Sequence, residues 1–370
     1  MKSIKKVALL VISVLFLCGC SRYQSLENLI IVIGTGYDIS ENDVEDDMEI
    51  TAQIVKSGEE EDDFINVSSI AKTNVQAAED ISLQIGGQAY LQHEAVMVVG
   101  EELAQRGAAQ VFEGSYSMEG KGAGQYVAIC QGKASELLSR ENAMTGVPAR
   151  ALNRMFKRVD NEMYYLPITL QEVVQSTAGK SQTALIPYIC MDENDEVWVK
   201  SMAVLENYRL KGILTRQEAT GALWAGNHIR NGNLEIQMAD GSIVSLEMVD
   251  CQTNSSMEVR GGTPVMTTSI RISAAISNQT NFEDMLTQQT REELANRTRE
   301  QILSQINAAF GRAQQWDADM IGAHELLYQL GEETYQKYHD NLLSTMKYEA
   351  VIDISFIDYG VKYGNLEETE

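Results

Sequence analysis

Positive charge is scarce in this sequence, and its scarcity bears first on what the protein can bind. Only 29 Lys and Arg residues oppose 53 Asp and Glu residues, so the 370-residue chain has a formal net charge of −24. A surface this acidic repels nucleic acids and anionic lipid headgroups. The composition therefore argues against a nucleic-acid-binding role, although 44% hydrophobic and 22% charged residues are typical of a globular protein.

Long apolar runs are also missing, as are the spacings that metal and catalytic sites require. No stretch after the N-terminal leader approaches the 18 consecutive apolar residues of a membrane span. Cys130, Cys190 and Cys251 are far apart and form no CxxC pair, which indicates small buried side chains better than zinc ligands or a disulfide framework. The four histidines form no HExxH motif, and no serine lies in GxSxG. We therefore expect no catalytic residues, no metal site and no cofactor.

Two glycine motifs resemble phosphate-binding loops but lack a required position. Gly34-Thr35-Gly36 follows an apolar run, yet Ile39 stands where a dinucleotide fingerprint needs its third glycine. We expect this motif to be a turn between strands. Gly179-Lys180-Ser181 has Val174 at the position of the first P-loop glycine, so it predicts no nucleotide site either.

The N-terminus has the pattern of an export signal. A basic start, Lys2 to Lys6, is followed by eleven mostly apolar residues, 7–17, which are too few to cross a bilayer. The run ends in Leu17-Cys18-Gly19-Cys20, which resembles a bacterial lipobox with cleavage after Gly19 and a lipid on Cys20. We expect residues 1–19 to be a lipoprotein signal peptide and residues 20–26 a tether that reaches at most about 25 Å. The alternative is an ordinary signal peptide that happens to end near a cysteine.

The remaining chain alternates strand-like and helix-like segments, which predicts an α+β protein of three consecutive mixed α/β domains. A hairpin is expected around Ala239-Asp240-Gly241, because Asp-Gly between alternating runs favours a two-residue turn. No sheet is expected to cross a domain junction. The expected domains are an N-terminal α/β domain at 27–180, a middle mostly-β domain at 181–264, and a strand–helix–helix–strand domain at 265–370.

Several segments are similar in order and spacing to the Ger(x)C family, the lipoprotein C subunits of spore germinant receptors. The segments that carry the resemblance are LIIVIGTGYD (29–38), AYLQHEAVMVVGEELA (89–104), GKASELL (132–138), ALIP (184–187), AVL (203–205), GIL (212–214) and GALW (221–224).

This resemblance implies a non-enzymatic subunit that is held by its lipid on the outer face of the spore inner membrane. It also implies two integral-membrane receptor subunits as partners in nutrient-triggered germination. Whether the chain itself binds a small molecule stays open. One rival is a solute-binding lipoprotein of a transporter, for which an aromatic-lined cleft between 27–180 and 181–370 would be the sign. Another is a secreted hydrolase with paired carboxylates.

Overall fold

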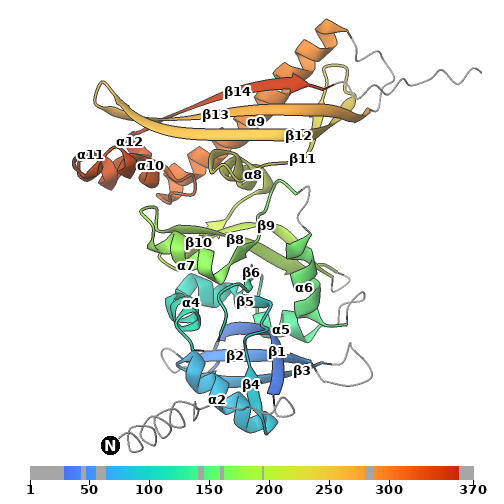
Figure 1. Ribbon diagram of the computed structural model, residues 1–370, viewed down its shortest axis with the longest axis vertical. Coiled ribbons are helices and arrows are strands. Elements are labelled where there is room, and N and C mark those ends of the chain that lie inside the picture. Colours follow the sequence, from blue (N-terminus) through green and yellow to red (C-terminus); the bar gives the residue numbers. More distant parts are fainter. Residues whose placement is uncertain are drawn as a thin grey trace, which may run out of the picture.

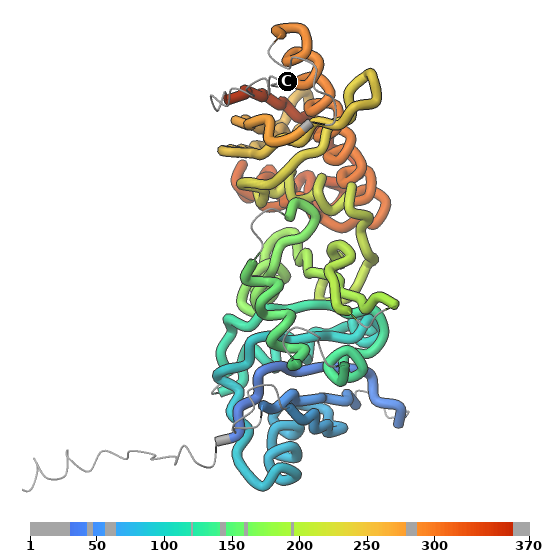
Figure 2. Tube along the Cα trace, turned by 90° about the vertical axis from the view of Figure 1, so that its right-hand side faces the viewer, coloured from blue at the N-terminus to red at the C-terminus, as the bar shows by residue number. Residues whose placement is uncertain are grey.

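The chain folds into a mixed α/β protein in which two sheets are stacked along the long axis of the molecule (Figure 1). Figure 2 shows the same stack from the side, with the N-terminal strands at one end and the C-terminal helices and strands at the other. The computed structural model describes residues 29–42, 47–55, 64–119, 121–140, 146–158, 162–193, 196–279 and 287–357. The expected signal peptide, the tether and Cys20 lie outside the described residues.

The first sheet has the strand order β10-β9-β8-β6-β5-β1-β2-β3, and two short strands, β4 and β7, pair with β1 and β6. Its central strands β1, β5, β6 and β8 are mutually parallel, and antiparallel pairs extend both sides. The strands are β1 (Leu29–Ile39), β2 (Met48–Val55), β3 (Phe64–Ala71), β4 (Gln88–Tyr90), β5 (Val96–Gly100), β6 (Tyr126–Cys130), β7 (Ile168–Thr169), β8 (Thr183–Met191), β9 (Val197–Glu206) and β10 (Arg209–Ile213).

Helices cover both faces of this sheet, which is why its central strands are continuously apolar. All five residues of β5 are buried, as expected for a parallel strand with protein on each side. Helices α5 and α6 pack on one face, and α2, α3, α4 and α7 pack on the other. These helices are α2 (Asn74–Ile85), α3 (Glu101–Arg106), α4 (Ala109–Tyr116), α5 (Ala134–Ser139), α6 (Pro148–Lys157) and α7 (Leu170–Ala178).

The second sheet is built around one long hairpin with the order β11-β12-β13-β14. Strands β11 (Gly232–Gln237), β12 (Ile243–Arg260) and β13 (Thr263–Gln279) are antiparallel neighbours, and β14 (Lys347–Phe356) pairs with β13 in parallel. The long helix α9 (Gln288–Trp316) packs against one face through Leu294, Ile302 and Ile306.

Shorter helices connect the two halves of the stack. Helix α8 (Arg216–Ala225) is buried from Glu218 to Ala225, because it lies between the first sheet and α9. The elements after α9 are α10 (Ala323–Gln329), α11 (Glu332–Tyr338), the 3-10 helix η2 (His339–Asn341) and α12 (Leu342–Thr345). One apolar core runs from β5 and β6 into α8 and on to Ala309 and Leu343, so the halves share their interior.

The element types expected along the chain are largely confirmed, but two expectations are wrong. The first sheet continues across residue 180 to β10, and the second runs across residue 264, so neither expected junction separates one sheet from the next. The middle segment is mostly strand, and it also contains the packed helix α8, which the sequence pattern did not indicate. The second error concerns Gly34 and Gly36, which lie within β1 rather than in a turn. At these positions Ala149 of α6 and Ala134 of α5 come close enough to leave little or no room for a side chain.

Candidate functional site

Three of the segments that resemble the Ger(x)C family meet inside the first sheet. Asp38, near the end of β1, accepts hydrogen bonds from the backbone N–H groups of Ala134 (2.7 Å) and Ser135 (2.8 Å) at the start of α5. The same carboxylate leaves no room for a side chain at Gly100, where β5 ends. A carboxylate at the N-terminus of a helix satisfies otherwise free N–H groups and stabilises the helix. Asp38 therefore holds β1, β5 and α5 in register.

A buried ion pair lies on the other side of β1. The ammonium of Lys121 lies 2.8 Å from Glu94, and both side chains are only 1% exposed. Thr35 donates to Glu94, and Lys121 also donates to the hydroxyls of Tyr37 and Ser115, each at 3.3 Å. Burial lowers the pKa of Lys121, but the charge of Glu94 and these hydrogen bonds raise it by more, so the net pKa is raised. A nucleophilic lysine needs a lowered pKa and access to substrate, so this group is structural.

A cavity of about 580 Å³ lies where the two halves of the molecule meet. Its walls come from α7 and the turn that follows it, from the segment between α8 and β11, from β12, and from the loop before α10. The described residues that line it include no Phe, Tyr or Trp. Polar side chains such as Gln175, Asn227 and Asn254 lie among them, together with His228, whose pKa is lowered chiefly by burial.

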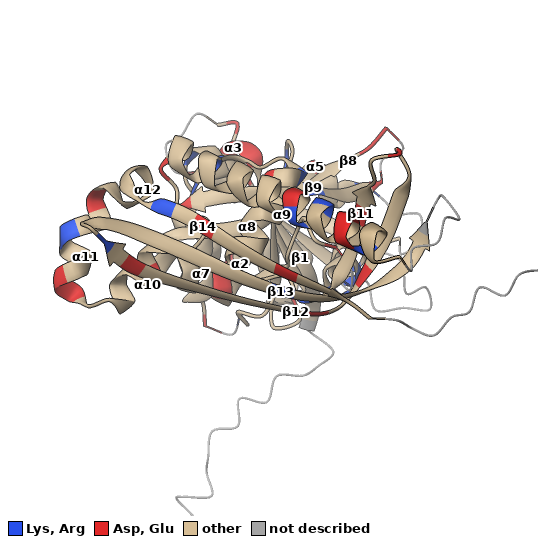
Figure 3. Cartoon of the chain, turned by 90° about the horizontal axis from the view of Figure 1, so that it is seen from above, with Lys and Arg blue, Asp and Glu red and all other residues tan. Residues whose placement is uncertain are grey.

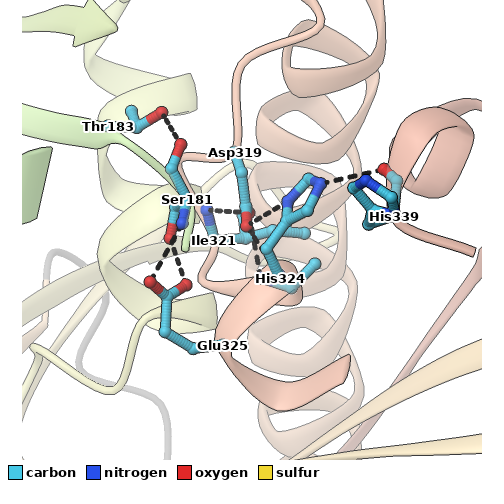
Figure 4. A network of polar contacts seen from close by, with 8 residues as sticks. Ser181, Thr183, Asp319, Ile321, His324, Glu325 and His339 are labelled. Atoms are coloured by element: carbon cyan, nitrogen blue, oxygen red, sulfur yellow. Dashed lines mark hydrogen bonds and ion pairs between the residues drawn. The ribbon is translucent and has the colours of Figure 1, made fainter. Parts of the chain in front are cut away.

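One wall of the cavity is organised by Asp319, as Figure 4 shows. Its buried carboxylate accepts from the backbone N–H groups of Ile321 (3.3 Å), Ala323 (2.9 Å) and His324 (2.7 Å), and from Nδ1 of His324 (2.8 Å). Burial raises the pKa of Asp319, but these hydrogen bonds and the charge of His324 lower it by more, and the net pKa is lowered. Asp319 thus fixes the loop that begins α10.

His324 has no ring nitrogen left for proton transfer. Nδ1 contacts the Asp319 carboxylate, and Nε2 lies 3.2 Å from the backbone carbonyl oxygen of His339. Both partners are acceptors, so both ring nitrogens have to donate, which only the imidazolium form can do. Burial lowers the pKa of His324, but Asp319 raises it by more, so the net pKa is raised. The pair resembles part of a catalytic triad, yet its geometry makes it a structural ion pair.

Hydrogen bonds join the turn after α7 to α10 at the wall of the cavity. The backbone N–H of Ser181 donates to Glu325 Oε1 at 3.0 Å, and the Ser181 hydroxyl donates to Glu325 Oε2 (Figure 4). Lys180 lies 4.2 Å from the ring centroid of Tyr328 and 5.1 Å from that of Tyr335. Gly179-Lys180-Ser181, which the sequence does not support as a phosphate loop, is therefore one of the contacts between the first half and the C-terminal helices.

These contacts were not predicted from the sequence, because Ser181 and Glu325 are 144 positions apart. The described residues contain no group of three or more His, Cys, Asp or Glu side chains that could hold a metal. Cys130, Cys190 and Cys251 are buried and unpaired, as expected, and burial raises the pKa of each thiol. Among the described residues, no helix is long and apolar enough to span a membrane.

The described chain thus has a two-sheet mixed α/β fold, in which the buried pairs Lys121–Glu94 and Asp319–His324 are held by other protein groups. Two family models match the chain, the Spore germination protein N-terminal domain over residues 22–191 and the Spore germination B3/GerAC like, C-terminal domain over residues 200–360. The chain belongs to the GerAC/GerBC-like family of spore germination proteins, whose members are generally non-catalytic germinant receptor subunits.

A solved structure supports the fold assignment. The crystal structure of the GerBC protein superposes with a TM-score of 0.56 and 16% sequence identity, over 88% of this chain and 97% of that one. At this level of identity the likeness concerns the fold alone. No curated protein matches the chain by sequence.

Proposed function

We propose that this chain is the lipid-anchored, non-enzymatic subunit of a spore nutrient-germinant receptor. In this proposal Cys20 carries the lipid, and the body acts on the outer face of the spore inner membrane. Its function is to contact two integral-membrane receptor subunits. The observation that carries the proposal is the ordered match of both family domains, which together run from residue 22 to residue 360.

The chemistry of the described residues supports a role through contacts rather than through turnover. Lys121 and His324 are the buried groups that most resemble catalytic residues, and each is fully engaged with structural partners. A lipid anchor would also confine the body near its partners. Confinement raises the effective concentration of those partners, so modest contacts suffice for assembly.

The solute-binding alternative fits the cavity less well. Specific small-molecule sites are mostly enclosed by apolar and aromatic side chains with a few converging polar groups. The described lining of the 580 Å³ cavity includes no Phe, Tyr or Trp, and Glu325 and Asp319 on its wall already bond to protein groups. We therefore rank a solute-binding function second.

Anchor variants in sporulating cells test the proposal directly. Cys20→Ser removes the thiol that would accept the lipid, while Cys18→Ser changes the neighbouring cysteine and serves as the matched control. We expect the wild-type and Cys18→Ser chains to co-purify with integral-membrane receptor subunits from spore membranes. Cys20→Ser should be lost from the membrane fraction and should germinate poorly.

Mass spectrometry of the mature N-terminus gives an independent readout. A diacylglyceryl modification on Cys20 is expected, and an unmodified N-terminus at Met1 or Ser21 would contradict the anchor. Calorimetry with amino acids and sugars should show weak binding or none. Tight binding of one nutrient to the isolated chain would reverse the ranking in favour of the solute-binding role.

A further inference from the structure

A groove with mixed apolar and polar walls lies at the end of the molecule opposite the second sheet (Figure 1). Helix α2, strand β4 with the residues that follow it, and residues 118–119 form its walls, and its volume is about 810 Å³. Leu83 and Val75 line the groove and are 81% and 52% exposed. Exposed apolar surface of this kind, gathered in one place, marks a contact site.

The groove lies along the side of α2 that is turned away from the sheet. Val75, Ala78, Ile81 and Ser82 share one helical face in sequence, but only Ile81 is buried. Val75, Ala78 and Ser82 instead line the open groove, while Asn74, Ala77 and Ile81 face the sheet. Within the described structure, Val75 and Leu83 on this side of α2 are therefore exposed, whereas Ala77 and Ile81 are covered by protein.

Charge is distributed unequally between the two ends of the molecule. From Ser82 to His93, twelve consecutive residues contain no Asp, Glu, Lys or Arg. At the far end, both signs of charge appear on α9, α11 and β14, as Figure 3 shows. In a chain with a net charge of −24, this uncharged segment is a part of the surface that can approach a membrane with little electrostatic repulsion.

The strand pairing places the start of the described chain beside this groove. Leu29 pairs with Gln88 and Ile31 with Tyr90, so β1 and β4 run in parallel. The chain therefore enters β1 at the end of β4 that adjoins Gly87, a residue that lines the groove. Eight residues separate Cys20 from Leu29, and they span at most about 29 Å when extended.

We propose that the α2–β4 end of the molecule lies against the headgroup region of the lipid bilayer, with Leu83 and Val75 inserted at the interface. The proposal rests on the anchor at Cys20 put forward above. An acyl anchor combined with a second, weaker contact gives a fixed orientation that one flexible tether does not. The molecule then stands on this end and presents its second sheet away from the membrane.

Two carboxylates, Glu79 and Glu119, also line the groove. Because they are repelled by anionic headgroups, the contact should be strongest on zwitterionic vesicles and weaker as anionic lipid is added. The acidic remainder of the surface should show the same repulsion, which keeps the long axis of the molecule away from the plane of the bilayer.

Site-specific fluorescence on the lipidated full chain tests this orientation. Leu83→Cys receives an environment-sensitive NBD label, and Val351→Cys, 60% exposed on β14 at the far end, is the matched control. The three native thiols of the described body are buried. On phosphatidylcholine vesicles containing doxyl-labelled lipid, we expect at least twofold quenching of the label at 83 and none at 351.

A charged residue introduced at an exposed position of the groove tests the membrane contact without changing the core. Val75→Glu in the labelled Leu83→Cys chain should reduce the quenching, whereas Val351→Glu in the same chain should leave it unchanged. Vesicles rich in phosphatidylglycerol should also reduce it. These changes are at exposed positions, so circular dichroism should remain that of the wild type.

Three other outcomes would overturn the proposal in distinguishable ways. If the chain floats with vesicles and both labels stay unquenched, the docking is wrong and the anchor stands. If the label at 83 changes only when a membrane receptor subunit is added, a protein covers the face and the lipid contact is wrong. If the chain fails to float at all, the anchor is wrong and the docking is wrong with it.

Discussion

Strands β5 and β14 differ in how many of their side chains face protein. Every residue of β5 is buried, whereas along β14 buried Ile352 and Ile354 alternate with exposed Val351, Asp353 and Ser355. The reason is that helices cover both faces of the first sheet, while α9 covers one face of the second. A change in a central strand of the first sheet therefore reaches a core whichever way the side chain points, and a change in β14 does so only at alternate positions.

The largest effect is expected inside the first sheet, at the buried ion pair. Lys121→Ala leaves the carboxylate of Glu94 buried without its partner, which should lower the free energy of unfolding by about 3–5 kcal/mol. Arg106→Ala is the control, because its pair with Glu102 is 67% and 70% exposed, and it should cost at most about 1 kcal/mol. Urea unfolding measures both, and equal losses would refute the distinction between buried and exposed pairs.

Substitutions at neighbouring residues test directly whether protein covers both faces of the first sheet and only one face of the second. Val98→Ala and Val99→Ala point to opposite faces of β5, and each should cost about 2–3 kcal/mol. On β14, Ile352→Ala should cost about 2–4 kcal/mol, while Val351→Ala should change stability by at most about 0.5 kcal/mol. Thermal or urea unfolding of the four variants gives the answer. A Val351→Ala loss as large as that of Ile352→Ala would show that something covers the outer face of the second sheet.

Alanine substitution of two helical glycines should change the free energy of unfolding in opposite directions, because only one of them lies at a helix contact. A Cβ at Gly221 in α8 would overlap the backbone carbonyl of Gln305 in α9, so Gly221→Ala should cost about 1–3 kcal/mol. Gly311, in α9, faces open space, and Gly311→Ala should stabilise the protein by about 0.5–1 kcal/mol. Calorimetric unfolding should show the two variants on either side of the wild type; a stabilising Gly221→Ala would contradict the close helix contact.

The smallest effect is a pH dependence at the junction. The raised pKa of His324 contributes stability that is present below its ordinary value of 6.5 and is lost as the pH rises through the folded value. The lowered pKa of Asp319 contributes stability above its ordinary value of 3.8, which is lost as the pH falls through its folded value. The difference in unfolding free energy between wild type and His324→Gln should therefore be largest near pH 5–6 and shrink towards pH 9.

Urea titrations at several pH values measure this difference. His93→Gln, at an exposed position, is the control and should follow the wild-type curve. A His324→Gln difference that grows with pH would contradict the imidazolium assignment.

Local pattern was sufficient for most of the strands and helices. The apolar run of β5, the Asp240-Gly241 turn between β11 and β12, and the alternation along β14 all predict what the structure has. Helix α8 escaped prediction because GALWA is apolar on every side, so it has no polar face to reveal a helical period. A signal was present nonetheless, since Thr215 and Glu218 form a capping box at its start.

Contacts between residues far apart in the chain could not be predicted from the sequence. Strand β8 joins the first sheet through β6, and Ser181 meets Glu325, but neither partner is indicated by any local pattern. The exposed side of α2 was not indicated by the sequence either, because apolar spacing does not say whether protein or another surface covers a helical face.

The position of β14 in the chain has a consequence for biosynthesis. Strand β13 ends at Gln279 and β14 begins at Lys347, so 67 residues are synthesised between the two strands of this parallel pair. At about 5–20 residues per second, the β12–β13 hairpin waits roughly 3–13 s for its last partner. During that interval the 17-residue strand β13 presents an open edge, which is a template for pairing with another chain. A product that terminates before Lys347 would keep that edge open, and we expect it to aggregate even though every strand of the first sheet is complete.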